Sequence, residues 1–160
     1  MQKYEELLVS LRKVTRAIGI YSKKLSKESG LTSPQLIVLK EIDQHDGCMV
    51  KDIAQSINLS SATVTSILDR LEARAYVIRE RSIKDKRKVG LHLTEQGKTV
   101  INNAPRPLQA RFINSFEKLQ DWEQTQLVST MQRIASMMDA ENLDAAPMLE
   151  VGAIQEITEP

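Results

Sequence analysis

The sequence predicts a mainly helical fold that carries one small β-hairpin. Apolar residues recur at three- and four-residue steps over most of the 160-residue chain, which is the period of an amphipathic helix. Residues 76–94 instead alternate apolar and polar residues on either side of a polar turn, as the two strands of a hairpin do. With 41% hydrophobic residues, the chain has the composition and length of one domain with a real core.

The first three predicted helices precede the hairpin. The first ends near Gly30. Its apolar stripe consists of Leu7, Leu11, Val14, Ile18, Tyr21 and Leu25. "TSPQLIVLKEI" starts the second, with Ser33 expected as its N-cap and Pro34 at the first helical position, where a missing N–H costs nothing. "HDGC" interrupts this helix, and the extended piece "CMV" leads into the third, whose apolar face is Val50, Ile53, Ala54 and Ile57.

A tight turn at residues 58–60 separates the third helix from a fourth, which begins at Ser61. Its core-facing residues are Val64, Ile67, Leu68 and Leu71. Its opposite face carries Ser61, Thr63, Thr65, Ser66, Asp69 and Arg70. Small hydroxyl residues at the exposed start of the second helix of a pair are typical of a helix-turn-helix, because they let the backbone approach base edges and phosphates. An ordinary helix pair that is Ser/Thr-rich by chance fits this segment equally well.

The hairpin decides between these two interpretations. Strands are predicted over residues 76–82 and 89–94, with a polar turn at 83–88. A basic-tipped hairpin directly after a helix-turn-helix makes a winged helix. Its basic residues are expected to lie beside a DNA duplex, with the tip able to enter a minor groove.

Charge is concentrated in two segments of a chain whose net charge is only +1. Residues 70–98 hold nine Lys/Arg and four Asp/Glu, whereas residues 139–160 hold six acids and no base. The basic segment suggests a polyanionic partner, although a solvated face is the commoner explanation of such a run. We expect residues 1–145 to form a single unit and residues 146–160 to form an acidic, flexible tail.

Residues 51–97, "KDIAQSINLSSATVTSILDRLEARAYVIRERSIKDKRKVGLHLTEQG", resemble the MarR family of bacterial transcription regulators. The match comprises the helix-turn-helix, the D-x-R of the wing and the L-T-x-x-G exit, and with the flanking helices it extends over residues 5–140. The resemblance implies a homodimeric winged-helix protein, usually a repressor, on double-stranded DNA with a palindromic operator. Asp85 and Arg87 match the wing pair, in which the carboxylate is expected to orient a guanidinium that enters the minor groove.

The predicted DNA-binding residues lie at the start of the fourth helix, on its exposed face and in the wing. They are Ser60, Ser61, Thr63, Thr65, Ser66, Arg70, Arg79, Arg81, Lys84, Asp85, Lys86, Arg87 and Lys88. Two residues depart from the family pattern. Ala75 stands where the family has Gly, so that either the turn is made differently or Ala75 is strained by roughly 1–2 kcal/mol. Gly90 in the returning strand suggests a mobile wing.

A second apolar stripe near the C-terminus predicts a dimer, with Asp121 and Gln124 as the capping pair of its helix. A winged-helix lobe over residues 33–94 is too small to bury both this stripe and that of the first helix. Dimerisation helices are therefore expected over residues 3–29 and 95–140, interrupted at Pro105 and Pro107. The residues expected at the seam are Leu7, Leu11, Val14, Leu127, Met131, Ile134 and Met138. The alternative is a self-contained helical bundle.

The resemblance also implies a cleft for an anionic or phenolic effector. Candidate lining residues are Arg16, Tyr21, His45, Arg111 and Trp122, although packing or solvation explains each of them more simply. Some relatives use a thiol as a redox switch, but Cys48 has no basic neighbour in "DGCMV" and is expected to be buried and inert. His92 is expected to face solvent.

The sequence predicts no metal site and no cofactor, because its two His and one Cys do not make up a cluster of metal ligands. It has no Gly-rich phosphate loop and no convincing pair of nucleophile and base, so we do not expect an enzyme. It also lacks an apolar run near the roughly 20 residues of a membrane span, and its first residues do not read as a signal peptide. We therefore expect no membrane partner and a cytoplasmic protein, which is associated with the bacterial nucleoid when it is bound to DNA.

The predicted function is that of a sequence-specific, DNA-binding transcriptional regulator. Two alternatives stay open: a winged-helix module that binds a protein partner, and a ligand- or redox-sensing regulator of stress or efflux genes. "APRPLQ" and "MDAENLDAAPMLEVG" are similar to segments of a subgroup that controls compatible-solute genes. In that subgroup, ionic strength could itself be the signal, since protein–DNA affinity falls steeply with salt.

Overall fold

The computed structural model describes residues 2–143 together with Met148 and Leu149. These residues form two compact units, with the boundary between Pro105 and Arg106. The first unit ends at Pro105 and also includes Leu149, and the second ends at Met148. Each unit is described by itself below.

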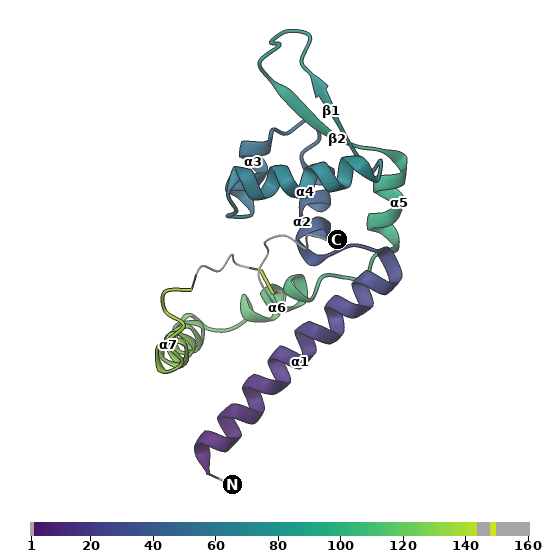
Figure 1. Ribbon diagram of the computed structural model, residues 1–160. Coiled ribbons are helices and arrows are strands. Elements are labelled where there is room, and N and C mark those ends of the chain that lie inside the picture. The colour runs from purple at the N-terminus through teal and green to yellow at the C-terminus, as the bar shows by residue number, and fades with distance from the viewer. Residues whose placement is uncertain (1, 144–147, 150–160) are drawn as a thin grey trace. The chain divides into compact units, whose positions relative to one another are not determined.

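The first unit contains five helices and one two-stranded antiparallel sheet among its described residues. In chain order these elements are α1 (Lys3–Ser29), α2 (Ser33–Gln44), α3 (Val50–Ser56), α4 (Ser61–Ala73), β1 (Val77–Arg81), β2 (Val89–Leu93) and α5 (Glu95–Asn103). The hairpin projects beyond α2, α3 and α4, and α1 is one long rod whose N-terminus lies at the opposite end of the unit (Figure 1). The predicted fold class, mainly helical with a hairpin wing, is confirmed.

The core of this unit lies where α2 and α4 meet β2. The predicted core face of α4 is confirmed, since Val64, Leu68 and Leu71 are fully buried and Ile67 nearly so. Further fully buried side chains are Leu25, Leu31, Leu36, Val38, Leu39, Ile42, Ile53, Val77 and Leu91. Of the residues in α1, only Leu25 is buried, so this helix joins the core by its last turns alone.

Two helices begin one residue earlier than their predicted caps imply. Thr32, rather than Ser33, caps α2, because its hydroxyl accepts the Gln35 N–H at 3.4 Å and the Gln35 side chain accepts the Thr32 N–H at 3.1 Å. In α7 (Asp121–Met137), the N–H of Gln120 donates to the Glu123 carboxylate at 2.8 Å, so the predicted pair of Asp121 and Gln124 is wrong. In both helices, the side chain that lies three residues after the N-cap accepts the backbone N–H of the cap residue. This reciprocal capping pair determines where the helix begins.

The extended piece after α2 lies against the wing. The Gly47 N–H donates to the Leu91 carbonyl and the Leu91 N–H to the Cys48 carbonyl, each at 2.9 Å. A Cβ on Gly90 would lie 3.2 Å from the Gly47 carbonyl oxygen, so the glycine serves this close approach. His92 does not face solvent as predicted. Its side chain is 29% exposed, and Nδ1 lies 2.9 Å from Oδ1 of Asp46 in the same extended loop.

Ala75 follows the last turn of α4 and takes a left-handed conformation with a φ of 58°. The turn after α4 therefore has the left-handed conformation that glycine favours, although Ala75 carries a Cβ. Ala75→Gly should raise the free energy of unfolding by about 0.5–1 kcal/mol, the relief of strain less the entropy that glycine adds to the unfolded chain. Urea denaturation checks this. The matched control, Ala73→Gly inside α4, should lower stability by about 0.5–1 kcal/mol, and equal effects of the two changes would contradict the assignment of strain.

The L-T-x-x-G segment joins the wing to α5. Thr94 caps α5, since its Oγ1 accepts the Gly97 N–H at 3.0 Å and donates to the Ala75 carbonyl at 2.6 Å. The Thr94 N–H donates to the Tyr76 carbonyl at 3.1 Å. A Cβ on Gly97 would lie only 2.2 Å from that same Tyr76 oxygen. The motif therefore fixes the start of α5 directly onto the turn that follows α4.

The second unit contains α6 (Leu108–Phe116) and α7. Residues 104–107 separate α5 from α6, so the predicted interruption at Pro105 and Pro107 is confirmed. The segment 95–140, which was predicted as one kinked dimerisation segment, therefore consists of α5, α6 and α7. Within α6, the rings of Phe112 and Phe116 stack with centroids 5.7 Å apart.

Candidate nucleic-acid interface

The exposed face of α4 begins at a well-formed N-terminus. Ser60 is the N-cap, and its Oγ accepts the Thr63 N–H at 3.1 Å. The hydroxyls of Ser60 and Thr63 also lie 2.8 Å apart. Ser61, Thr65 and Ser66 are exposed beyond this cap. The first turn of α4 thus presents small hydroxyl side chains and the positive end of a helix dipole, and both of these favour an approach to phosphates and base edges.

The contacts of Arg79 differ from the predicted role of a residue presented to DNA. Its guanidinium pairs with two carboxylates of α4, that of Asp69 at 2.7 Å and that of Glu72. Partial burial lowers the pKa of Arg79, but the hydrogen bond to Asp69 and the charge of Glu72 outweigh it and leave the pKa raised. Arg79 neutralises two acids of α4, the candidate recognition helix, that would repel phosphates, and it attaches the wing to α4.

The tip of the wing is a hydrogen-bonded β-turn over residues 85–88. The Lys88 N–H donates to the Asp85 carbonyl at 2.9 Å, which closes the turn. The Asp85 carboxylate accepts the backbone N–H of Arg87 at 3.1 Å, as an aspartate at the first position of a turn commonly does. Among the ion pairs of the described residues, none joins the Asp85 carboxylate to the Arg87 guanidinium. The carboxylate therefore shapes the backbone that carries Arg87, and the orientation of the guanidinium toward a minor groove stays a prediction.

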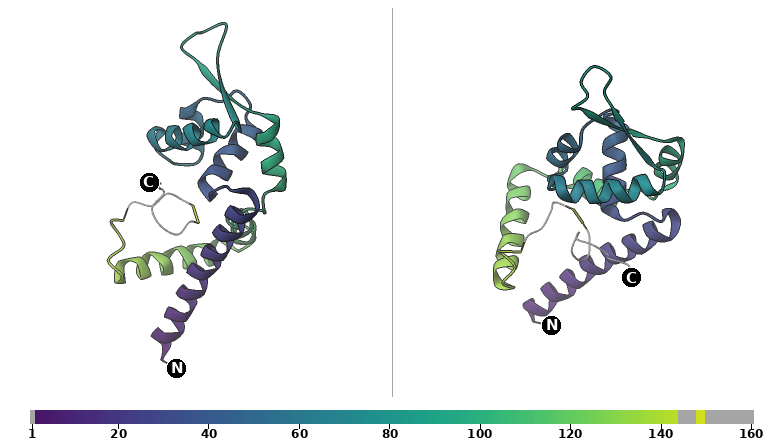
Figure 2. Two further views of the ribbon diagram at one scale, coloured as in Figure 1. Left: turned by 45° about the vertical axis from the view of Figure 1, so that its right-hand side comes forward. Right: turned by 45° about the horizontal axis from the view of Figure 1, so that its top comes forward.

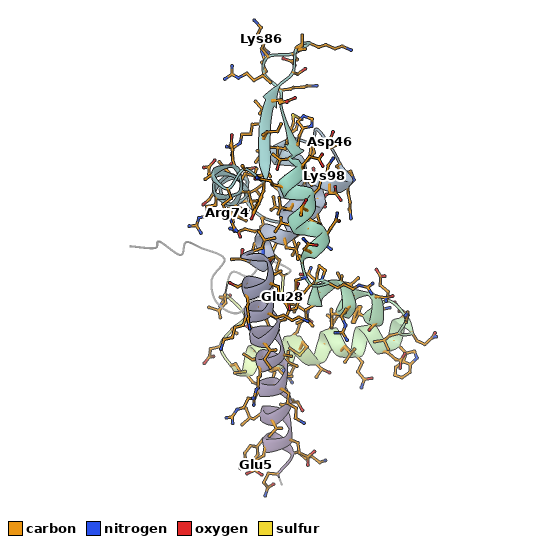
Figure 3. The ribbon with its side chains drawn as sticks, turned by 90° about the vertical axis from the view of Figure 1, so that its right-hand side faces the viewer. Glu5, Glu28, Asp46, Arg74, Lys86 and Lys98 are labelled. Carbon is orange, nitrogen blue, oxygen red and sulfur yellow. The ribbon has the colours of Figure 1, made fainter. Side chains whose placement is uncertain are left out.

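The basic side chains of the wing are presented to solvent. Figure 3 places Lys86 at the far end of the hairpin, opposite the end of the unit where Glu5 of α1 lies. The exposed cations of the wing are Arg81, Lys84, Lys86, Arg87 and Lys88. The wing projects beyond the helices in both views of Figure 2. A projecting rod that carries five cations on and around one turn is suited to following a phosphate backbone.

A second set of contacts joins α1 to the end of α4. The Arg74 guanidinium donates to the Gly30 carbonyl at 2.6 Å and to the Tyr76 hydroxyl at 3.1 Å, and it lies over the Tyr76 ring. Gly30 ends α1 in a left-handed conformation with a φ of 67°. The end of the long helix is thereby attached to the end of the recognition helix, at the place where Figure 3 labels Arg74. Sequence reasoning missed this contact because its partners lie 44 residues apart and no local pattern links them.

The chain is similar in sequence to a family of known proteins. The family model described as "MarR family" matches residues 31–89. The HTH-type transcriptional regulator SarZ of Staphylococcus epidermidis is 34% identical over 110 residues, which are 69% of this chain and 73% of SarZ. The chain belongs to the MarR family. The HTH-type transcriptional regulator MgrA of Staphylococcus aureus is 35% identical over 97 residues, 60% of this chain and 66% of MgrA.

Solved structures of other proteins share the fold of this chain. YusO of Bacillus subtilis aligns with a TM-score of 0.55 and 25% identity over 83% of this chain and 94% of YusO. A MepR-like protein aligns with a TM-score of 0.58 and 20% identity, over 86% and 97% of the two chains, and shares the fold. A MepR mutant from S. aureus, solved bound to an oligodeoxyribonucleotide, shares it as well, with a TM-score of 0.52 and 20% identity over 86% of this chain and 99% of that one. As a member of the MarR family that is similar to the HTH-type transcriptional regulator SarZ, the chain is a DNA-binding transcriptional regulator and not an enzyme.

Cys48 of this MarR-family chain has the surroundings of an unreactive thiol. It is half-buried, and burial raises the pKa of its thiol, which the carboxylates of Asp52 and Glu41 raise further. Because the thiolate is the reactive form, both effects disfavour oxidation. Across residues 2–143, no group of three or more His, Cys, Asp or Glu side chains could hold a metal ion, and no helix there is long and apolar enough to cross a membrane.

The candidate effector residues are distributed over both units. Arg16 and Tyr21 lie along α1, whereas Arg111 and Trp122 belong to the second unit. His45 ends α2 and is paired with Glu41, with Nδ1 and Oε1 3.3 Å apart. An effector cleft lined by these five side chains stays a prediction.

Proposed function

We propose that this MarR-family regulator acts as a homodimer that binds a palindromic operator and represses the adjacent promoter. The observation that supports the homodimer is the set of large apolar side chains exposed on the long terminal helices. Tyr4 is 63% exposed, Leu8 54% and Val14 56% on α1, and Met131 is 54% exposed on α7. Apolar faces of this extent on helices outside the winged-helix lobe are typical of a subunit interface.

Individual seam residues differ in how well they fit this proposal. Leu7, Val14, Leu127, Met131 and Met138 are exposed, and Leu11 is half-buried. Ile134 is only 7% exposed, so it is already packed within its own chain. We therefore assign Ile134 to the interior of the protomer, and Leu127, Met131 and Met138 to the seam.

A two-fold dimer determines the form of the operator. Two recognition helices related by such an axis read the same bases on opposite strands, so the site should be a pseudo-palindrome with half-site centres roughly 34 Å apart. A dimer bound at a promoter competes with RNA polymerase for the DNA, and this competition represses transcription. The exposed cations of each wing would release counterions on binding, so affinity should fall steeply with salt. An affinity for DNA that falls with salt suits a regulator of compatible-solute genes, which is associated with the bacterial nucleoid when it is bound to DNA.

The experiment that tests the operator is genome-wide mapping of the bound sites, followed by footprinting of the strongest of them. We expect one protected pseudo-palindrome per site, and half-sites moved by five base pairs should lose most of the affinity because they then face opposite sides of the duplex. Protection of single, unpaired half-sites would argue against the dimeric operator.

The dimer itself is tested by light scattering at micromolar concentration, where the wild-type chain should have twice the monomer mass. Met131→Glu should dissociate it, because two carboxylates cannot be buried unpaired at a two-fold seam. The matched control is Ser129→Glu, which places the same charge on the exposed opposite face of α7 and should leave the dimer intact. A monomeric wild type, or a dimeric Met131→Glu variant, would rule out this seam.

A further inference from the structure

Two large apolar side chains of the winged-helix lobe are exposed, and the others are buried or half-buried. Between Leu31 and Leu93, the large hydrophobic residues that the structure leaves exposed are Ile78, at 41%, and Ile83, at 99%. Ile78 lies in β1, where half-exposure of an outward-facing residue is ordinary. Ile83 lies in the loop of the wing, two residues before the β-turn at the tip, and touches almost nothing of its own chain. The most exposed apolar side chain of the lobe is therefore carried by the projecting wing.

The tip holds Ile83 in this position. The Ser82 N–H donates to the Lys88 carbonyl at 2.9 Å, and the Ser82 hydroxyl accepts the Asp85 N–H at 3.3 Å. Ile83 is thus held between two residues that bond across the loop, and next to the closed turn at residues 85–88. Its β-branched side chain has few accessible rotamers, so little entropy is lost when it packs against a partner.

The surroundings of Ile83 determine which partner fits. Arg81 and Lys84 are its exposed basic neighbours, and Lys86, Arg87 and Lys88 follow on the same loop. A protein partner that covered Ile83 would also have to desolvate or pair these cations. A DNA minor groove offers both chemistries at once, since phosphates line its rims and deoxyribose and base edges form its walls.

We infer that Ile83 is an apolar DNA contact, which enters the minor groove at the wing and wedges against a base step while the flanking cations hold the two phosphate rims. The inference rests on the proposed function, because it needs a wing that is seated on an operator. Side chains of this kind partly unstack the step that they enter and widen the groove toward them. The wing would then select flexible pyrimidine–purine steps at the flanks of the operator, because these unstack at the least cost.

The test is a fluorescence-anisotropy titration of operator DNA over a series of salt concentrations. Ile83→Ala should weaken binding at every salt concentration by about tenfold or more for each wing, and so by about 100-fold or more for a dimer, since each wing loses most of a buried isoleucine side chain. The slope of log affinity against log salt should not change, because no charge is lost. Lys84→Ala should instead reduce that slope by about one per wing, as the loss of a phosphate contact does.

The matched control is Ile78→Ala, the same truncation at the other exposed apolar residue of the lobe, which should bind like the wild type. A second readout is 2-aminopurine placed at the flanking minor-groove step, whose fluorescence should rise on binding of the wild type and much less with Ile83→Ala. If the Ile83→Ala protein bound the operator with wild-type affinity, or gave the same 2-aminopurine signal as the wild type, the minor-groove wedge would be overturned. The proposed function would be unaffected by that result. Failure of the wild type to bind any operator would instead reject the proposed function.

Discussion

Replacement of Gly97 by Ala should destabilise the winged-helix unit more than any other single change considered for this chain. The added Cβ would lie 2.2 Å from the Tyr76 carbonyl oxygen, which is a backbone atom and cannot rotate away. Either α5 or the turn after α4 must move, and the hydrogen bond from the Thr94 N–H to the same oxygen would be lost with it. We expect a loss of about 3 kcal/mol or more, the upper end of what overpacking costs.

Chemical denaturation of the purified variant, followed by circular dichroism, measures this loss. The matched control is Gly19→Ala in α1, where an added Cβ meets no atom of the described residues within 4 Å outside the adjacent backbone of the helix itself. That change should stabilise α1 slightly, because alanine is favoured over glycine in a helix by up to about 1 kcal/mol. A Gly97→Ala protein with the denaturation midpoint of the wild type would show that the close approach to Tyr76 does not exist in solution.

The parts of the fold that follow local rules could be predicted from the sequence. The apolar period of α4 identified its buried face, because a helix at the surface of a small lobe packs only one face against the core. That face carries Val64, Leu68 and Leu71. The alternation on both sides of a polar turn identified the hairpin, whose strands pair Val77 with Leu93 and Arg81 with Val89. Pro105 and Pro107 likewise marked a break whose cause lies in the residues themselves.

Contacts that depend on the tertiary fold could not be predicted in this way. Arg79 reads as one more cation of the wing, and only the packing of β1 beside α4 brings it to Asp69 and Glu72. His92 alternates with buried neighbours and therefore reads as solvent-facing, until the loop at Asp46 covers it. The sequence thus identified the elements that carry the candidate DNA-binding residues, but it could not tell which of their cations are already paired within the chain.

Arg87→Ala should lower operator affinity by about 100-fold or more, because a dimer would lose one minor-groove contact of about 1–3 kcal/mol in each half-site. The side chain is exposed and takes part in no ion pair with a described residue, so the free energy of unfolding should not change. Anisotropy titrations of operator DNA, together with thermal melts and light scattering, separate these effects. The matched control is Lys86→Ala at the neighbouring turn position, which should weaken binding only modestly and mainly through the salt dependence.

Two changes at Asp85 then decide how Arg87 is held. The Asp85 carboxylate accepts the Arg87 N–H, so Asp85→Ala should loosen the turn and weaken operator binding several-fold, although it removes a negative charge from beside the DNA. Asp85→Asn removes the same charge but keeps an oxygen that can accept this N–H, and it should bind at least as tightly as the wild type. If the wing were only a diffuse patch of charge, both variants would bind more tightly and to the same extent. Opposite responses to Ala and Asn can arise only if the backbone of the turn, shaped by the Asp85 side chain, directs Arg87 toward the groove.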